Sequence, residues 1–185
     1  MIIGVTGLPC SGGGSFAECL VSAGFKHLSY SGILREELKK QGLDVTRVAM
    51  QNLGNEIRAR YGGGELSRRL LAKMEPGFSY VLTTIRNPEE VEVLRGTGKF
   101  ILIHVDAPRE ERYKRMSARA RESDPLKYED FIALENKELG KDQEQHGLRM
   151  EDCFKMADFT IVNDSSFEEL KRKVDELLTS FGAKI

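Results

Sequence analysis

A glycine-rich run near the N-terminus combines residue types that bind phosphate groups. It spans residues 7–15 and reads G-L-P-C-S-G-G-G-S. A phosphate-binding loop needs inward-pointing backbone N–H groups, glycines that permit this curvature, and a helix whose N-terminus faces the anion. The template G-x-x-x-x-G-K-[ST], in its G-K-G-[ST] variant, is matched everywhere except at the lysine. The residues expected to bind phosphate are Gly7, Pro9, Ser11, Gly12, Gly13, Gly14 and Ser15.

Gly13 stands where the template has its lysine. That ammonium normally reaches the β- and γ-phosphates and follows the charge as it transfers. Loss of one such preorganised charge commonly costs on the order of a hundredfold or more in rate. Backbone amides still cradle phosphate without it, so we expect turnover to suffer more than binding. The alternative is a turn that binds nothing, against which position, spacing and flanking elements all argue.

Other side chains could complete such a site. Ser15 offers a hydroxyl to Mg²⁺, or simply caps the helix that follows. Arg86 directly follows a strand of buried character, at the carboxyl end where ligand groups cluster in parallel sheets. Arg35 lies on an amphipathic helix, where it either grips phosphate oxygens or is ordinary surface charge.

Three arginines recur at three- and four-residue spacing and so share one helix face. They are Arg112, Arg115 and Arg119. Like charges on one face are unfavourable unless anions neutralise them. Either bound phosphates do so, or nearby carboxylates do, namely Glu110, Glu111 and Glu122.

Composition narrows the range of functions. The 185 residues carry a formal net charge of −1, which argues against a generally basic nucleic-acid-binding surface. No apolar run is long enough to span a bilayer, so we expect no membrane association. The three cysteines are odd in number and lack metal-ligand spacing, and the three histidines are scattered, so we assign no zinc site. A reduced cytoplasmic setting is the simplest interpretation.

Short β-rich runs alternate with helical spacing, which predicts an α/β fold with a parallel sheet covered on both faces. Strands are expected at 2–6, 25–29, 80–84, 100–105 and 159–163. Helices are expected at 16–23, 32–40, 45–61, 66–74, 88–95, 109–121, 127–139 and 167–181. We expect a single domain over 1–185, with one helical insertion at about 30–75 that binds an acceptor and another at about 109–156 that acts as a lid.

These motifs together resemble the P-loop nucleotide kinases, in particular archaeal-type adenylate-kinase-related and dephospho-CoA-kinase-like proteins. Residues 7–12 resemble G-x-P-G-S-G, with Cys10 in place of a glycine. Residues 28–35 resemble I-S-T-G-D-x-L-R, with Gly32 in place of the aspartate. Residues 83–91 resemble D-G-I-R-N-P-x-E-V, and residues 163–166 resemble the terminal N-D/N-G-S turn.

The resemblance implies a three-layer α/β/α P-loop fold with a five-stranded parallel sheet and a donor ATP bound with Mg²⁺. By carry-over, Ser15 would hold the metal and Asn163 would abut the donor base. The residues implied to bind the acceptor are Ser29, Arg35, Arg58 and Arg86. Those implied to act on the transferring phosphoryl group are Arg86, Arg115 and Arg119.

Two departures from the pattern affect charged positions. They are Gly13 at the lysine and Thr83 at a carboxylate associated with magnesium. The leading hypothesis is a protein that binds ATP and transfers its γ-phosphoryl group to a nucleotide-type acceptor, either a nucleoside monophosphate or a dephospho-CoA-like molecule. The alternatives are an impaired kinase that senses nucleotide, and an interaction domain that binds none. Nucleotides are the expected partners. Whether the protein also binds another protein or forms a homodimer is left open.

Overall fold

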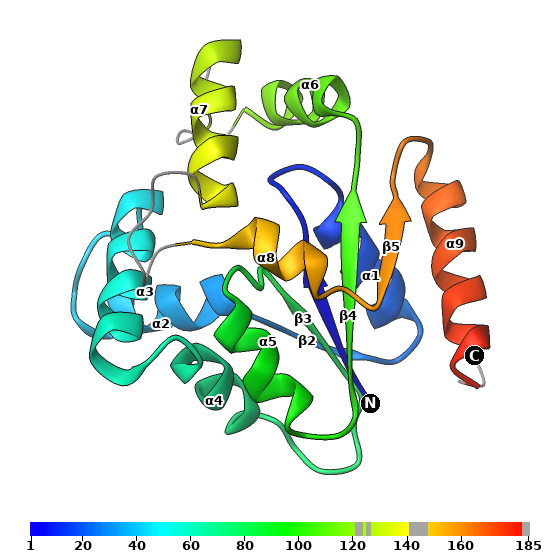
Figure 1. Cartoon of the computed structure of the whole chain (residues 1–185), viewed down its shortest axis with the longest axis horizontal. Helices are drawn as coiled ribbons and strands as arrows, with labels where there is room; N and C mark the ends of the chain where they lie inside the picture. The colour runs from blue at the N-terminus through cyan, green and yellow to red at the C-terminus, as the bar shows by residue number, and fades with distance from the viewer. Residues whose placement is uncertain (121–123, 125–126, 141–147, 183–185) are drawn as a thin grey trace.

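The computed structural model describes residues 1–120, 124, 127–140 and 148–182. Its centre is a five-stranded sheet in the order β2-β3-β1-β4-β5, in which all pairings are parallel (Figure 1). The strands are β1 (Ile2–Thr6), β2 (Lys26–Ser29), β3 (Tyr80–Thr83), β4 (Phe100–Asp106) and β5 (Phe159–Val162). They agree with the predicted strands to within one or two residues.

Helices cover both faces of the sheet. Those in the described residues are α1 (Gly13–Ser22), α2 (Tyr30–Lys40), α3 (Arg47–Tyr61), α4 (Glu65–Leu71), α5 (Pro88–Arg95), α6 (Arg109–Arg119), α7 (Tyr128–Leu139), α8 (Met150–Lys155) and α9 (Phe167–Ser180). One apolar core packs α1 and α9 against one face of the sheet. A second core packs the helices α2, α3, α4, α5 and α8 against the other face. The short α8 lies within the predicted lid region, and no helix was predicted at its position.

Alternation along the central strands explains why both faces are buried. Ile3 pairs in register with Val81 and Ile101, and its side chain is fully buried with α1 and α9. Leu82 and Leu102 point to the opposite face and belong to the core of α4 and α5. Strands that are apolar on both faces therefore require the two helical layers that the structure shows.

The apolar side chains of the last helix pack against the sheet except at its first residue. Leu170, Val174, Leu177 and Leu178 are buried, whereas Phe167 is 48% exposed. Phe167 is the first residue of α9, directly after its N-cap, and its side chain lies outside the part of the helix that packs against the sheet. Within the described residues, no helix is both long and apolar enough to cross a membrane.

Candidate functional site

The glycine-rich loop connects the end of β1 to the start of α1, beside the carboxyl ends of β1 and β4 (Figure 1). Gly7, Cys10 and Gly12 all have positive φ, at 153°, 64° and 109°. A Cβ atom on Gly7 would lie 2.3 Å from the carbonyl oxygen of Val105, so only glycine fits this approach to β4. Cys10 keeps the left-handed conformation of the glycine that it replaces in the family pattern. A loop of this kind forms a concave nest of backbone N–H groups.

The first turn of α1 begins at Gly13, three residues before the predicted start, which brings the helix N-terminus up to the loop. No side chain caps this turn, so its amides stay available to an anion. Nothing lies within 4 Å of the Cβ position of Gly14. The loop therefore fits the phosphate groups of a nucleotide.

Asn163, directly after the edge strand β5, contacts the loop. Its Nδ2 atom donates to the carbonyl oxygen of Ser11 at 2.9 Å, and its own backbone N–H donates to Asp106 at 2.7 Å. A Cβ atom on Gly12 would lie 1.9 Å from Nδ2 of Asn163. The side chain thus faces the loop itself, and its expected contact with a donor base stays a prediction.

Arg115 brings a positive charge from α6 to the loop. Its Nη2 atom donates to the carbonyl oxygen of Asn163 at 2.9 Å, and Nη1 lies 3.5 Å from the carbonyl oxygens of Cys10 and Ser11. Gly13 provides no ammonium, whereas Arg115 brings a guanidinium into contact with the loop. The resemblance implies that Arg115 acts on the transferring phosphoryl group, and in the structure its side chain lies against the loop of residues 7–15.

Arg112 and Arg119, which share a face of α6 with Arg115, pair with carboxylates outside that helix. Arg112 is buried and donates to Glu135 of α7 at 2.8 Å. Arg119 pairs with Asp124 through two contacts of 2.9 and 2.6 Å, and this hydrogen bonding raises the pKa of Arg119. For these two side chains the neutralising carboxylates are Glu135, 23 residues away, and Asp124, five residues away, instead of Glu110 and Glu111. Glu122 and Arg121 lie outside the described residues.

Thr83 and Thr84 occupy the positions of the family's D-G pair at the end of β3. The Thr83 hydroxyl lies 2.8 Å from Nε2 of His27 on β2. Burial lowers the pKa of His27, which favours the neutral imidazole that can share this hydrogen bond. Thr84 has a φ of 69°, the left-handed conformation that suits the glycine of the pattern. The contact of His27 with Thr83 could not be predicted from the sequence, because the two residues lie on different strands.

Ser15 and Thr83 are the candidates to hold Mg²⁺. Both offer hydroxyls, and only Ser15 matches the expected ligand, since a hydroxyl at Thr83 cannot supply a carboxylate's charge. Within the described residues there is no group of three or more His, Cys, Asp or Glu side chains that could hold a metal ion. The role of Ser15 as a ligand of Mg²⁺ stays a prediction.

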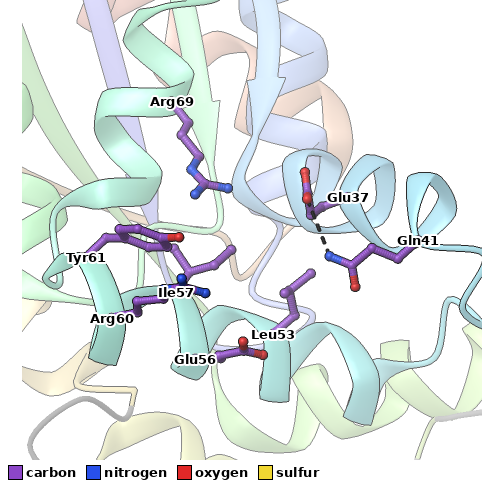
Figure 2. A pocket seen from close by; sticks show the side chains of 8 residues that line it. All are labelled: Glu37, Gln41, Leu53, Glu56, Ile57, Arg60, Tyr61 and Arg69. Atoms are coloured by element: carbon purple, nitrogen blue, oxygen red, sulfur yellow. Dashed lines mark hydrogen bonds between the residues drawn. The ribbon is translucent and has the colours of Figure 1, made fainter.

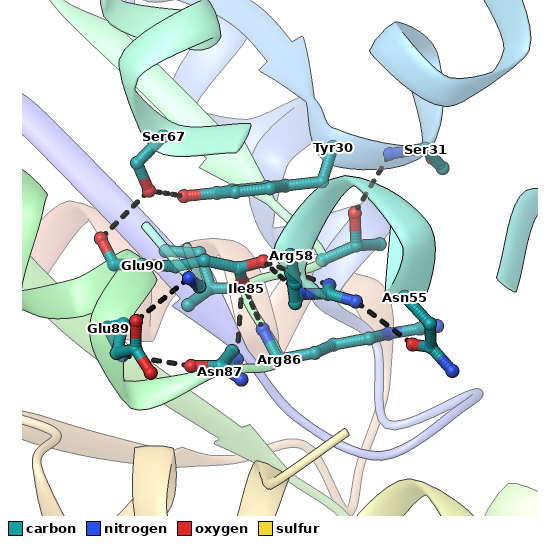
Figure 3. Close-up of polar contacts among 12 residues, drawn as sticks. Tyr30, Ser31, Asn55, Arg58, Ser67, Ile85, Arg86, Asn87, Glu89 and Glu90 are labelled. Atoms are coloured by element: carbon teal, nitrogen blue, oxygen red, sulfur yellow. Dashed lines mark hydrogen bonds and ion pairs between the residues drawn. The ribbon is translucent and has the colours of Figure 1, made fainter. Parts of the chain in front are cut away.

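Arg58, which the resemblance implied would bind the acceptor, is a buried structural residue in this fold. It is 4% exposed, and its Nη2 and Nε atoms lie 2.9 and 3.2 Å from Oε1 of Glu90 (Figure 3). The other oxygen of Glu90 accepts from the backbone N–H groups of Arg86 and Asn87. Arg58 thus helps to fix the turn that presents Arg86, and its direct contact with an acceptor stays a prediction.

The remaining acceptor candidates lie around the start of α2 and the end of β3. Ser29 caps α2, with its hydroxyl accepting from the Gly32 N–H at 3.0 Å. Arg35 is exposed on α2. Arg86 is 30% exposed in its side chain, and its Nε atom lies 3.3 Å from Oε2 of Glu138 on α7. The structure therefore joins Arg86 to the lid region rather than to Arg35.

A separate cavity of about 180 Å³ lies among α2, α3 and α4 (Figure 2). The Tyr61 ring on its wall has the guanidinium groups of Arg60 and Arg69 at 5.2 and 5.7 Å from its centroid. Its other lining residues are Glu37, Gln41, Leu53, Glu56 and Ile57. The cavity falls within the predicted acceptor-binding insertion, yet none of its lining residues was a predicted site residue.

The loop, the switch from β1 to α1 and the parallel sheet together define a P-loop kinase fold. Shikimate kinase from Aquifex aeolicus has this fold, with a TM-score of 0.61 at 16% identity and 98% of each chain covered. Dephospho-CoA kinase from Campylobacter jejuni matches with a TM-score of 0.53 at 16% identity, covering 97% of this chain and 96% of its own. These likenesses confirm the predicted fold class and the resemblance to P-loop nucleotide kinases, and they show the fold alone.

Sequence relatives then give the family. A family model described as an AAA domain matches residues 6–132. The UPF0200 protein of Sulfurisphaera tokodaii is 31% identical over 177 residues, covering 96% of this chain and 95% of its own. The UPF0200 protein of Thermococcus gammatolerans is 32% identical over 185 residues, with 96% and 94% covered. The chain belongs to the AAA-domain family defined by that match and to the UPF0200 proteins.

Proposed function

We propose that this protein binds ATP with its phosphates on the loop of residues 7–15 and transfers the γ-phosphoryl group to a nucleotide-type acceptor. The observation that carries the proposal is the contact of Arg115 with the loop, because it supplies a cation where Gly13 supplies none. A phosphoryl-transfer site needs positioning and positive charge more than covalent chemistry. Arg115 on α6 and Arg86 in the turn after β3 would provide that charge.

In this proposal each residue has a separate task. Backbone amides of the loop and the first turn of α1 hold the phosphates. Ser15 would hold Mg²⁺, which when bound neutralises charge on the phosphate oxygens. Arg115 leaves its carbonyl partners to pair with phosphate, since a guanidinium binds anionic oxygens more strongly than neutral carbonyls. Arg86 and Ser29 would position the acceptor, with Arg119 further along α6 above the donor.

A second function is favoured by a specific observation. The Thr83 hydroxyl is hydrogen-bonded to His27 at the position where the family pattern has a carboxylate. With Gly13 at the lysine position, both charged groups of the pattern are replaced. A protein of this kind would bind ATP and report its level through the lid region without appreciable transfer. A reduced cytoplasmic location, where nucleotides are available, belongs to both proposals.

Calorimetric titration with ATP, ADP and nucleoside monophosphates, with and without Mg²⁺, tests these functions together with an assay of ADP formation. The proposal expects ATP binding and acceptor-dependent turnover. The Arg115→Gln variant should weaken ATP binding by roughly 10- to 150-fold, since a charge-assisted contact is worth roughly 1.5–3 kcal/mol. Lys114→Gln is the matched control, because Lys114 is exposed and pairs with Glu111 away from the loop.

ATP binding without turnover would select the sensor. Failure of every nucleotide to bind would overturn both and favour an interaction domain. Equal ATP affinity for Arg115→Gln and Lys114→Gln would remove Arg115 from the site while leaving ATP binding itself intact.

A further inference from the structure

Glu138 of α7 joins two arginines that come from different parts of the chain. Its Oε1 atom lies 2.7 Å from Nη2 of Arg47, at the start of α3. Its Oε2 atom lies 3.3 Å from Nε of Arg86, in the turn between β3 and α5. The carboxylate is 2% exposed, while the two arginine side chains are 27% and 30% exposed. One buried carboxylate of α7 thus links this helix to α3 and to the turn between β3 and α5.

The contacts of this carboxylate are incomplete. Oε2 of Glu138 is buried and accepts no hydrogen bond from the described residues, although it lies close to Arg86. A buried carboxylate oxygen without a hydrogen bond keeps much of its desolvation cost. By contrast, the neighbouring Glu135 on the same helix uses both oxygens, with Arg112 at 2.8 Å and Arg109 at 3.0 Å. The Glu138 arrangement is therefore the less satisfied of two similar arginine–carboxylate clusters.

The charges do not balance either. Two guanidinium groups carry two positive charges, and the single carboxylate between them carries one negative charge. A phosphomonoester dianion has the charge to neutralise both arginines and has three oxygens for their N–H donors. Guanidinium forks also match phosphate geometry as well as they match carboxylate geometry.

We propose that Arg47 and Arg86 form the binding site for a phosphomonoester dianion of the acceptor, and that Glu138 occupies this site until the ligand displaces it. The inference rests on the proposed function for the role of Arg86, and it adds Arg47 and the class of acceptor group. Glu138 is an internal competitor that holds α7 against α3 and the β3–α5 turn. Ligand binding releases it, so acceptor binding and movement of α7 are coupled.

The test compares Glu138→Gln with the matched control Glu129→Gln. Both remove one negative charge from α7, but Glu129 is exposed near the start of the helix. The probes are AMP, inorganic phosphate and ATP, each titrated by calorimetry. If the closed arrangement holds about nine-tenths of the molecules, neutralising Glu138 should tighten AMP and phosphate binding by up to about tenfold. ATP affinity should not change in either variant.

A second variant and a second readout keep the test decisive if Glu138→Gln folds poorly. Arg47→Gln should weaken AMP binding and leave ATP binding unchanged. In the wild type, saturating AMP should speed hydrogen exchange of the α7 amides, because the helix loses its link to Arg47 and Arg86.

The outcomes separate this inference from the proposed function. Unchanged or weaker AMP binding in Glu138→Gln, or α7 exchange that AMP does not alter, would make the cluster a static ion pair and overturn the inference. Loss of ATP binding alone, with the AMP results as expected, would overturn the proposed donor site and leave the anion site standing. A tightening equal to that of Glu129→Gln would reflect net charge only and would also overturn the inference.

Discussion

Asn163 and Ser11 are hydrogen-bonded to one another across 152 residues of chain, with Nδ2 of the amide 2.9 Å from the loop carbonyl. This contact ties the glycine-rich loop to the turn after β5. It also fills the space beside Gly12, where a Cβ atom would approach Nδ2 of Asn163 to 1.9 Å. The loop conformation is therefore held by tertiary contacts as well as by its own glycines.

Gly12→Val should abolish nucleotide binding. A β-branched side chain would overlap Asn163 and would have to adopt a φ of 109°, which strains any residue other than glycine. Calorimetric titration with ATP measures the loss, and thermal unfolding reports whether the variant folds. Glu18→Val is the control, because it adds the same side chain to an exposed position of α1. A folded Gly12→Val protein with unchanged ATP affinity would show that the loop is not a phosphate site.

Gly13→Lys should strengthen ATP binding. Gly13 is the first residue of α1 and has no positive φ, and a Cβ atom there would lie 3.2 Å from Cγ1 of Val5, a tight contact that needs a small shift. The added ammonium would make a charge-assisted contact with phosphate, worth roughly 1.5–3 kcal/mol. Gly13→Ala is the matched control, because it adds the same Cβ atom without charge. Weaker binding by Gly13→Lys than by Gly13→Ala would mean that the loop holds its ligand in another geometry.

Phosphoryl transfer should be faster in the Gly13→Lys/Thr83→Asp double variant than in the wild type or in either single variant. The aspartate would restore the carboxylate that helps to place magnesium, and we expect the double variant to exceed the sum of the single effects. Steady-state ADP formation by the wild type, the two single variants and the double variant measures this coupling. A double variant that turns over no faster than the wild type would contradict the prediction and identify Arg115 as a sufficient cation.

Arg58→Ala should destabilise the fold by about 3–5 kcal/mol, because it leaves the buried carboxylate of Glu90 without its charged partner. Urea unfolding measures the change. Arg68→Ala is the control, since Arg68 is 57% exposed and pairs with Glu65 on the same helix, where an ion pair contributes at most about 1 kcal/mol. Equal destabilisation by the two variants would show that the Arg58–Glu90 pair is not an important contact.

Stability should fall as the pH drops below about 6.5, and His104 should account for part of this loss. Burial lowers the pKa of His104, with the charge of Arg112 acting in the same direction and Asp106 opposing it. The folded state therefore binds fewer protons than the unfolded chain below that pH, so protonation favours unfolding. The ring also stacks on Phe154, with centroids 4.0 Å apart.

Urea unfolding at pH 7.5 and 5.5 tests this for the wild type and for His104→Gln. The variant should lose less stability between the two pH values, whatever its absolute stability. Burial also lowers the pKa of His27, so His27 contributes another part of the pH dependence of stability. Identical pH dependence in both proteins would exclude His104 as a contributor.

Much of the fold could be predicted from the sequence because the signals are local. The five strands are short apolar runs, and the helix of Phe167–Ser180 shows its buried stripe at helical spacing. The loop of residues 7–15 was visible because its glycines, its serine and the flanking elements are contiguous. Even the loss of the lysine at Gly13 could be recognised, since the template fixes its position between two glycines.

The tertiary structure decided which charged groups meet. Arg115 reaches Ser11 across 104 residues, Arg58 meets Glu90 across 32, and Glu138 joins Arg47 across 91. From its own helix alone, each arginine would be interpreted as surface charge. The spacing of residues along one helix shows only which of them share a face of that helix. Which carboxylate or carbonyl faces an arginine depends on how separate helices pack against the sheet, and that packing brings together residues that no local pattern links.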